Sequence, residues 1–283
     1  MIRDASPHDL NALGALFARA NDAPYDLAAV AEEKCFGHGI AGAPAVRAFE
    51  REGRIIGAAV RCGRFVRILI VDRDARGQGI GTALLADAEA RGASVVAAEA
   101  GNYFTPGVLD GAFFSHRGYV ETRSTWNLHV ELASLSLVES PLVRRVRHDE
   151  SDRVLDFIER EFGKIWRFEA AKAFQSAVVQ AFIAETEGAV TGFAVHDVNN
   201  RGLGFFGPAG VAETMRGRGL GCALVQASLA DLRRLGYSRA VIPWTDAIDF
   251  YRKCCGAEPA HRFVTMSRHG QFHSAVLAID SGA

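Results

Sequence analysis

Two glycine-rich segments of this 283-residue chain have the residue types and spacing of an anion-binding turn. They read Arg76-Gly77-Gln78-Gly79-Ile80-Gly81 and Arg216-Gly217-Arg218-Gly219-Leu220-Gly221. Each lies between an apolar run that ends in Val and a run with apolar residues at helical spacing, which predicts a strand, a turn and a helix. The first N–H groups of a helix lack intrahelical partners, and the helix dipole favours negative charge there. Glycine lets a phosphate approach these amides, and the leading arginine can add a charge-assisted contact, so both turns suit a diphosphate.

Other interpretations of these glycines fit less well. A Rossmann dinucleotide site has the spacing GxGxxG, and Gly77, Gly79 and Gly81 are one residue short of it, although Glu99 lies near the distance expected for its acidic residue. A Walker loop ends in Gly-Lys-Ser or Gly-Lys-Thr, which neither segment has. Tight turns without a ligand remain the structural alternative.

The two segments belong to a longer internal repeat, because they lie 140 residues apart (76 to 216) and other matches keep the same order. These matches pair His8-Asp9 with His148-Asp149, Glu52-Gly53 with Glu187-Gly188, and Phe113-Phe114 with Phe250-Tyr251. A repeat of this length indicates duplication of a whole domain. We expect an N-terminal domain at 1–135 and a C-terminal domain at 141–283, joined by a linker near Ser134–Pro141.

Each half is expected to have the order strand, helices, strands, helix, strand, helix, strand. In the first half, residues 45–50 and 54–61 predict a hairpin that turns at Glu52-Gly53, and residues 67–71 predict a buried strand. Apolar residues at helical spacing follow each turn, namely Ile80, Ala83, Leu84 and Ala88 in the first half and Leu220, Ala223, Leu224 and Ala227 in the second. Both glycine-rich segments are therefore predicted to connect a strand to a helix.

These features resemble the GNAT superfamily of acyl-CoA N-acyltransferases. The resemblance rests on Arg-x-x-Gly-x-Gly between a strand ending in Val, at Val71 and Val211, and an amphipathic helix, and it covers nearly the whole chain twice. It implies an α/β fold of two tandem GNAT-like domains, each with a mixed, mostly antiparallel central sheet flanked by helices. It also implies acetyl-CoA, or another short acyl-CoA, as co-substrate, and no metal.

In that superfamily the turn amides hold the CoA diphosphate, and the preceding strand pairs with the pantetheine arm. By resemblance, the cofactor-binding residues of the first half are Leu69, Ile70, Val71, Arg76, Gly77, Gln78, Gly79, Ile80, Gly81 and Thr82. Those of the second half are Ala209, Gly210, Val211, Arg216, Gly217, Arg218, Gly219, Leu220, Gly221 and Cys222.

The resemblance also implies that Tyr251, on a short helix ending near Gly256, faces the CoA sulfur. Acyl transfer from a thioester needs a proton for the departing thiolate, and a Tyr with an ordinary pKa of ~10 is protonated at neutral pH. Tyr251 is therefore the expected general acid, and a merely packed aromatic is the alternative. The aligned residue of the first half is Phe114, which has no proton to give, so that half is expected to be catalytically degenerate.

The general base is left open. His196 could face an acceptor cleft, but a packed or surface histidine is the favoured interpretation. Glu213 is expected near the phosphates, which a carboxylate would repel. Asp246 and Asp249 are expected to be helix-start residues rather than bases.

Further reactive or aromatic residues have simpler interpretations. Cys254 and Cys255 lie beside the expected acid, but no basic cluster is positioned to lower a thiol pKa, so buried small apolar residues are favoured. Trp126, Trp166 and Trp244 are expected to be core or cleft aromatics. The loop 101–107 either borders the first site or is a plain connector.

Composition narrows the function further. A formal net charge of −1 gives no field that would attract nucleic acid or anionic membranes. The cysteines have no CxxC spacing, and neither a signal peptide nor an apolar membrane span is evident, so a cytoplasmic location is expected. The expected function is transfer of an acetyl group from acetyl-CoA to a primary amine of a small molecule or peptide, by direct attack. The alternative is an acyl-CoA-binding regulatory or sensing protein, and the chain is expected to be a monomer with pseudo-dimeric halves or a homodimer.

Overall fold

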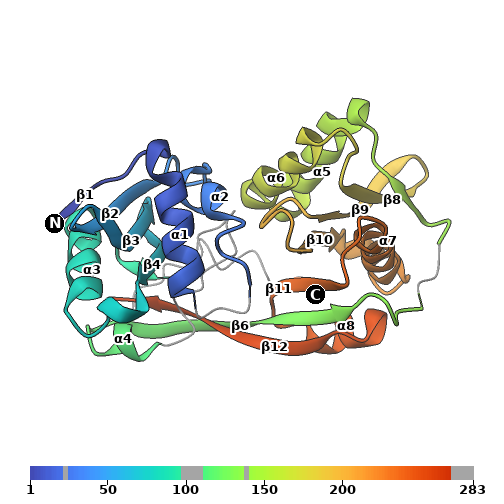
Figure 1. Cartoon of the computed structure of the whole chain (residues 1–283). Helices are drawn as coiled ribbons and strands as arrows, with labels where there is room; N and C mark the ends of the chain where they lie inside the picture. The colour runs from blue at the N-terminus through green and yellow to red at the C-terminus, as the bar shows by residue number, and fades with distance from the viewer. Residues whose placement is uncertain (22–24, 97–110, 137–139, 269–283) are drawn as a thin grey trace. The chain divides into compact units, whose positions relative to one another are not determined.

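The computed structural model describes residues 1–21, 25–96, 111–136 and 140–268 of the chain (Figure 1). The loop 101–107 lies outside the described residues. The chain forms two compact units. One contains Met1–Ser124 and the last part of strand β12 (Glu258–Ser267), from Phe263, and the other runs from Thr125 to Arg262.

The first unit is built on a mixed sheet. Its antiparallel strands are β1 (Ile2–Asp4), β2 (Ala45–Arg51), β3 (Arg54–Cys62) and β4 (Phe65–Val71). Strand β5 (Val95–Val96) runs parallel to β4, and β12 is antiparallel to β5. The turn between β2 and β3 has positive φ at both Glu52 (52°) and Gly53 (73°), which matches the twist of a two-residue hairpin. The predicted hairpin is therefore confirmed.

Helices cover this sheet. Helix α1 (Leu10–Ala20) and helix α3 (Ile80–Ala90) both pack against β3 and β4. Two short helices, α2 (Ala31–Phe36) and α4 (Ala112–Ser115), complete the described part of the unit. The order of elements is the one expected from the sequence.

The second unit repeats this order of elements. Strands β7 (Val143–Arg145), β8 (Ala181–Thr186), β9 (Ala189–His196) and β10 (Phe206–Val211) form an antiparallel sheet. Strand β11 (Arg239–Thr245) pairs antiparallel with β6 (Val120–Glu131). The turn from β8 to β9 has φ of 52° at Glu187 and 78° at Gly188, so it repeats the Glu-Gly hairpin turn of the first unit.

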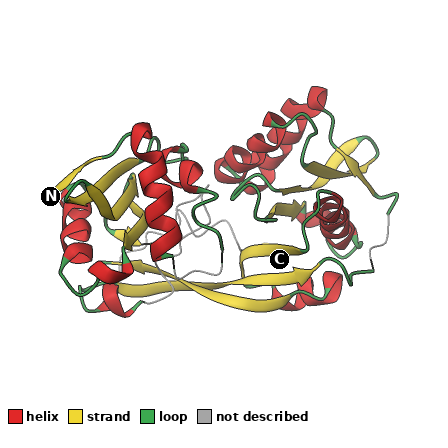
Figure 2. Ribbon diagram, viewed as in Figure 1, coloured by secondary structure: helices red, strands yellow, loops and turns green. Residues whose placement is uncertain are grey.

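Helices bury both faces of β8 and β9. Ile183 and Phe193 pack on the side of α5 (Ser151–Phe162) and α6 (Lys164–Ala171), whereas Ala184 and Ala194 pack on the side of α7 (Leu220–Arg234). Helix α8 (Ile248–Cys255) packs against α7. Figure 2 shows helices on either side of these strands. Because side chains alternate along a strand, a sheet covered on both faces has continuous apolar strands.

The last strand of each half reaches into the other compact unit. Residues Thr125–Glu131 of β6 belong to the second unit, where Trp126 and the residues after it pair with β11. Met266 and Ser267 of β12 pair with β5 in the first unit. The compact units therefore differ at their last strands from the halves 1–135 and 141–283, which remain a prediction from the internal repeat. No helix in the described ranges is long and apolar enough to cross a membrane.

Helix α5 begins at a buried carboxylate. Glu150 accepts hydrogen bonds from both Nη atoms of Arg144, at 2.8 and 2.7 Å, and from Nη2 of Arg153, at 2.6 Å. The Arg147 backbone N–H adds a fourth, at 2.9 Å. The Arg144 guanidinium holds the pKa of the Glu150 carboxyl well below its usual range. This network fixes the start of α5.

We expect Glu150→Gln to lower the free energy of unfolding by about 2 kcal/mol at pH 7, because charged hydrogen bonds are lost from a buried site. A carboxyl with a depressed pKa stabilises the fold above its unfolded pKa, and this contribution fades as the pH falls. The difference between wild type and variant, measured by urea unfolding, should therefore shrink below about pH 4. Asp149→Asn is the control, since its side chain is 72% exposed and its ion pair with Arg147 lies on the surface. Equal destabilisation by the two variants would contradict this account.

Candidate active site

Strands β10 and β11 begin side by side and then separate. Phe205, just before β10, forms a parallel bridge with Val241, and the Val241 N–H donates to the Gly204 carbonyl at 2.9 Å. Beyond this bridge, within the part of the chain that the structure describes, β10 pairs only with β9 and β11 only with β6. The edge of β10 at Ala209–Val211 therefore keeps backbone groups available for an extended ligand.

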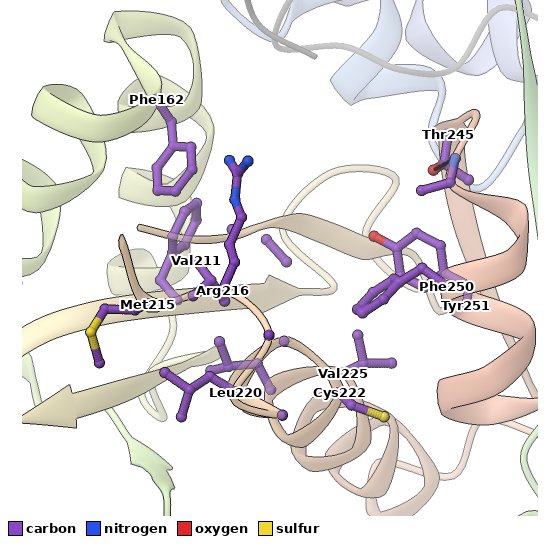
Figure 3. Close-up of a pocket in the computed structure, with 18 of the residues that line it drawn as sticks. Phe162, Val211, Met215, Arg216, Leu220, Cys222, Val225, Thr245, Phe250 and Tyr251 are labelled. Atoms are coloured by element: carbon purple, nitrogen blue, oxygen red, sulfur yellow. Dashed lines mark hydrogen bonds between the residues drawn. The ribbon is translucent and has the colours of Figure 1, made fainter. Parts of the chain in front are cut away.

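A cavity of about 430 Å³ opens between the separated strands (Figure 3). Its walls come from the ends of β10 and β11, the first turn of α7, helix α8 and the junction of α5 with α6. Of the residues expected from the sequence, it brings together Ala209, Gly210, Val211, Arg216, Gly217, Gly219, Leu220, Gly221, Cys222 and Tyr251. Arg218 does not line it.

The first unit has a corresponding cavity of about 560 Å³ at the end of β4. The expected residues that line it are Leu69, Ile70, Val71, Arg76, Gly77, Gly79, Ile80, Gly81 and Thr82. Gln78 does not line it, because its side chain bonds with Arg51 (2.8 Å) and with the Asp74 carbonyl (3.2 Å). Gln78 and Arg218 hold the same place in the repeat, so the residue between the first two glycines lies outside the cavity in both units.

Both turns leave their backbone amides uncovered. The φ angles of Gly217 and Gly219 are 75° and 79°, and a Cβ at either would have nothing within 4 Å. The first amide of α7 that bonds within the helix turn is that of Ala223, to the Gly219 carbonyl, and the amides of 217–222 donate to no other described residue. The amides of 77–82 are likewise without acceptors in the described first unit. Adjacent unbonded amides at a helix start form an anion site.

The leading arginines of the two turns differ. Arg76 donates to the Val71 carbonyl through Nε (3.1 Å) and to the Ala20 carbonyl through Nη2 (2.7 Å), so it braces its turn. Arg216 is exposed, its guanidinium bonds to no residue in the described ranges, and its side chain extends away from the turn in Figure 3. Of the two arginines expected to contact phosphate, only Arg216 has a guanidinium that is not already bonded to backbone carbonyls of the described residues.

Tyr251 and Phe114 occupy equivalent positions. A Cβ on Gly221 would meet the Phe250 ring at 3.2 Å, and a Cβ on Gly81 would meet the Phe113 ring at 3.4 Å. The next residue in each helix then lines the cavity of its unit. Tyr251 is half-buried, and its hydroxyl faces the cavity in Figure 3. Phe114 is buried and brings no hydroxyl to the first cavity.

His196 and the adjacent residues Cys254 and Cys255 are buried in the core, which agrees with the interpretation favoured from the sequence. His196 is fully buried, its Nε2 lies 2.7 Å from Oδ2 of Asp231, and it does not line the cavity. Burial raises the pKa of the Cys255 thiol to about 11 and that of the Cys254 thiol further. Both cysteines are therefore protonated at neutral pH.

Asp246 and Asp249 have different places at the start of α8. Asp249 lies in the first turn, as expected, and pairs with Arg252 at 3.2 Å. Just before this helix, Thr245 Oγ1 accepts from the N–H of the N-cap residue Ala247 at 3.0 Å, and no side chain of the described residues caps the helix itself. Asp246 takes part only through its backbone carbonyl, which accepts from Ile248, and the residue lines the cavity. The expected helix-start role of Asp246 does not extend to its side chain.

Aromatic residues form much of the cavity wall. The tryptophans are expected from the sequence to lie in the core or in a cleft. Trp166 and Trp244 line the cavity, and Trp126 packs against the core. Sequence reasoning missed Phe162 and Phe193, which line it as well. Their signal is faint, because aromatic residues in a helix and a strand ordinarily indicate a core.

Two family models match the sequence. The acetyltransferase (GNAT) domain matches residues 23–125, and the acetyltransferase (GNAT) family matches residues 147–257. Together they cover most of the chain, which therefore belongs to the GNAT acetyltransferase family and has two of its domains in tandem. No curated protein matches the sequence.

Solved structures with similar folds cover almost the whole chain. A glucosamine N-acetyltransferase region of a fungal multi-domain GH3 β-N-acetylglucosaminidase has a TM-score of 0.77 at 17% identity, over 94% of this chain and 38% of that one. A tandem GNAT protein from the clavulanic acid biosynthesis pathway has 0.68 at 16%, over 96% and 99%. A GCN5-related N-acetyltransferase from Sphaerobacter thermophilus has 0.65 at 18%, over 94% of each chain. At these identities the likeness establishes the fold, and the chain spans less than half of the fungal protein.

We expect Gly219→Glu to weaken binding of CoA to the second unit by at least about tenfold, because it places a carboxylate beside the amides that would hold the diphosphate. Gly236→Glu is a matched control, since Gly236 also has positive φ (94°) and open space, but lies beyond the far end of α7. Calorimetric titration with CoA measures the difference. Equal affinity in the two variants would remove the turn from the binding site.

Proposed function

We propose that the second unit transfers an acetyl group, or another short acyl group, from acyl-CoA to a primary amine by direct attack. The observation that carries this proposal is a single cavity with uncovered turn amides at one end and the Tyr251 hydroxyl along its wall. Membership of the GNAT family agrees with it.

The residues present fit an acyl-CoA. The amides of 217–222, with Arg216, would hold the diphosphate, and the open edge of Ala209–Val211 would pair with the amides of the pantetheine arm. Along this path the thioester would reach the part of the cavity that Tyr251 lines. The free state of all five cysteines agrees with the reducing cytoplasm in which such a carrier would be met.

Bound acyl-CoA supplies the thioester whose carbonyl carbon the neutral amine attacks, so that a C–N bond forms and a C–S bond breaks. Tyr251 donates its phenolic proton to the departing sulfur and recovers a proton from solvent. The acceptor ammonium loses two protons in all, one before attack and one from the new amide nitrogen. The net reaction yields an amide, CoA thiol and one proton. A general acid of this kind contributes roughly 100-fold or more to the rate.

For the first unit we propose binding of acyl-CoA without transfer. Its turn has the same uncovered amides at 77–82, and its cavity is of similar size. However, Phe114 stands where Tyr251 stands in the second unit, and Ile70 stands where Gly210 stands. Ile70 is only 8% exposed, and its side chain occupies the space beside the strand that Gly210 leaves to aromatic rings.

We expect Tyr251→Phe to lower kcat at least about 100-fold while the affinity for acetyl-CoA is kept, because only the proton-donating hydroxyl group is lost. Tyr237→Phe is the control, since it also removes a phenol hydroxyl, one that donates to Asp197 at 3.0 Å outside the cavity. Release of CoA thiol over a panel of amines is the measurement. Unchanged turnover in Tyr251→Phe would exclude this residue as the acid, and binding without thiol release for every amine would favour the sensing alternative.

We expect calorimetry to find two CoA sites per chain. Gly79→Glu should remove one site and leave turnover unchanged, whereas Gly219→Glu should remove one site and abolish turnover, because only the second unit has the Tyr251 hydroxyl. Gly92→Glu is the control for the first unit, with positive φ (94°) and open space at the far end of α3. Loss of turnover in Gly79→Glu alone would assign the chemistry to the first unit.

A further inference from the structure

The strand β10 has a different neighbour on each face. Ala209 and Val211 pack against the core that β10 shares with α7. Gly210, between them, points the other way, and a Cβ there would lie 2.6 Å from the Phe162 ring and 3.1 Å from the Trp166 ring. The turn amides that suit the diphosphate lie at the start of α7. The space toward Phe162 and Trp166 is therefore the acceptor side of the cavity.

Three aromatic rings form a wall on this side, which we call the aromatic wall: Phe162, Trp166 and Phe193. The Phe162 and Trp166 rings are stacked, with centroids 5.1 Å apart and planes at 17°. The Phe193 ring contacts both, with centroids 5.4 and 6.0 Å away, and is fully buried. Phe162 and Trp166 are only partly buried and line the cavity, so a further flat ring could extend the stack.

A carboxylate lies on the opposite side of the separated strands. Asp246 directly follows β11, and it is the single carboxylate among the described residues that line this cavity. Its carboxylate has no hydrogen-bond or ion-pair partner in the described ranges, and it does not cap α8. Figure 3 shows Phe162 and Thr245 at opposite sides of the pocket. An acceptor that spans the cavity would thus meet an apolar wall at one end and a negative charge at the other.

We propose that the acceptor is a primary amine joined by a short chain to an aromatic ring, with its ring on the aromatic wall and its ammonium at Asp246. This inference rests on the proposed function of the second unit. A hydroxyl-rich amine such as an amino sugar fits less well, because its hydroxyl groups would lose water against the faces of aromatic rings. The ammonium at Asp246 gives up one proton before attack, and the reaction then proceeds as written above.

The test compares 2-phenylethylamine with n-butylamine and with glucosamine, each with acetyl-CoA. We expect the KM for 2-phenylethylamine to be lower than that for n-butylamine by about tenfold, the scale of one aromatic pair. Trp166→Ala should raise the KM for 2-phenylethylamine about tenfold and leave the KM for n-butylamine and for acetyl-CoA nearly unchanged. Trp126→Ala is the matched control, because Trp126 packs against the core outside the cavity.

Asp246→Asn tests the other end of the acceptor. It should raise the KM for both simple amines several-fold, because each would lose the same ion pair, whereas Asp249→Asn should not, since Asp249 pairs with Arg252 outside the cavity. A better rate with glucosamine than with 2-phenylethylamine would overturn the acceptor class and leave the transferase intact. An equal effect of Trp166→Ala on all amines would overturn it too. Binding of acetyl-CoA without thiol release for any amine would overturn the transferase itself.

Discussion

The early separation of β10 from β11 is the constraint on which the candidate site depends. A strand that lacks a neighbour leaves backbone N–H and C=O groups that need other partners, so the gap must be held open by the surrounding structure. Both strands change register just beyond the Phe205–Val241 bridge, β10 between Phe206 and Ala209 and β11 between Ile242 and Thr245. Such irregularities redirect a strand and are frequent beside functional sites.

The departure of β11 has an identifiable cause. Trp244 has a left-handed φ of 54°, a conformation that costs an L-residue roughly 1 to 2 kcal/mol. Its backbone N–H donates to Oδ1 of Asn127, at 3.0 Å, and Asn127 is fully buried in β6. This bond offsets the strain and turns the end of β11, so that Thr245 and Asp246 reach the cavity. The positions of Trp244 and Asp246 at the cavity therefore depend on the side chain of Asn127, which lies on another strand.

What the sequence could predict is what local geometry decides. The turn at Gly217 and Gly219 needs a left-handed backbone, and so do the Glu-Gly hairpin turns. Glycine at these positions therefore predicts the turns from the sequence. The packing of Phe162 on Gly210 joins residues far apart in the chain, and no local pattern encodes it. The start of α8 is a further limit, because Thr245 and Asp246 are both residue types that cap helices, yet neither side chain caps this one. The entry of β6 and β12 into opposite units is likewise a long-range pairing.

The two units show which parts of such a site can change independently. The proposed binding of a diphosphate through 77–82 or 217–222 would use main-chain groups, so it would require glycine at a few positions and tolerate different neighbours, as Gln78 and Arg218 illustrate. Proton donation and recognition of an acceptor use side chains, and a single atom decides the first of them, the hydroxyl oxygen by which Tyr251 differs from Phe114. At the strand position where the second unit has Gly210, the first unit has Ile70, which lines its own cavity. In the proposed function, a duplicated unit keeps its carrier turn after it has lost the acid, which accounts for two similar turns whose cavities are lined by Tyr251 in one unit and by Phe114 in the other.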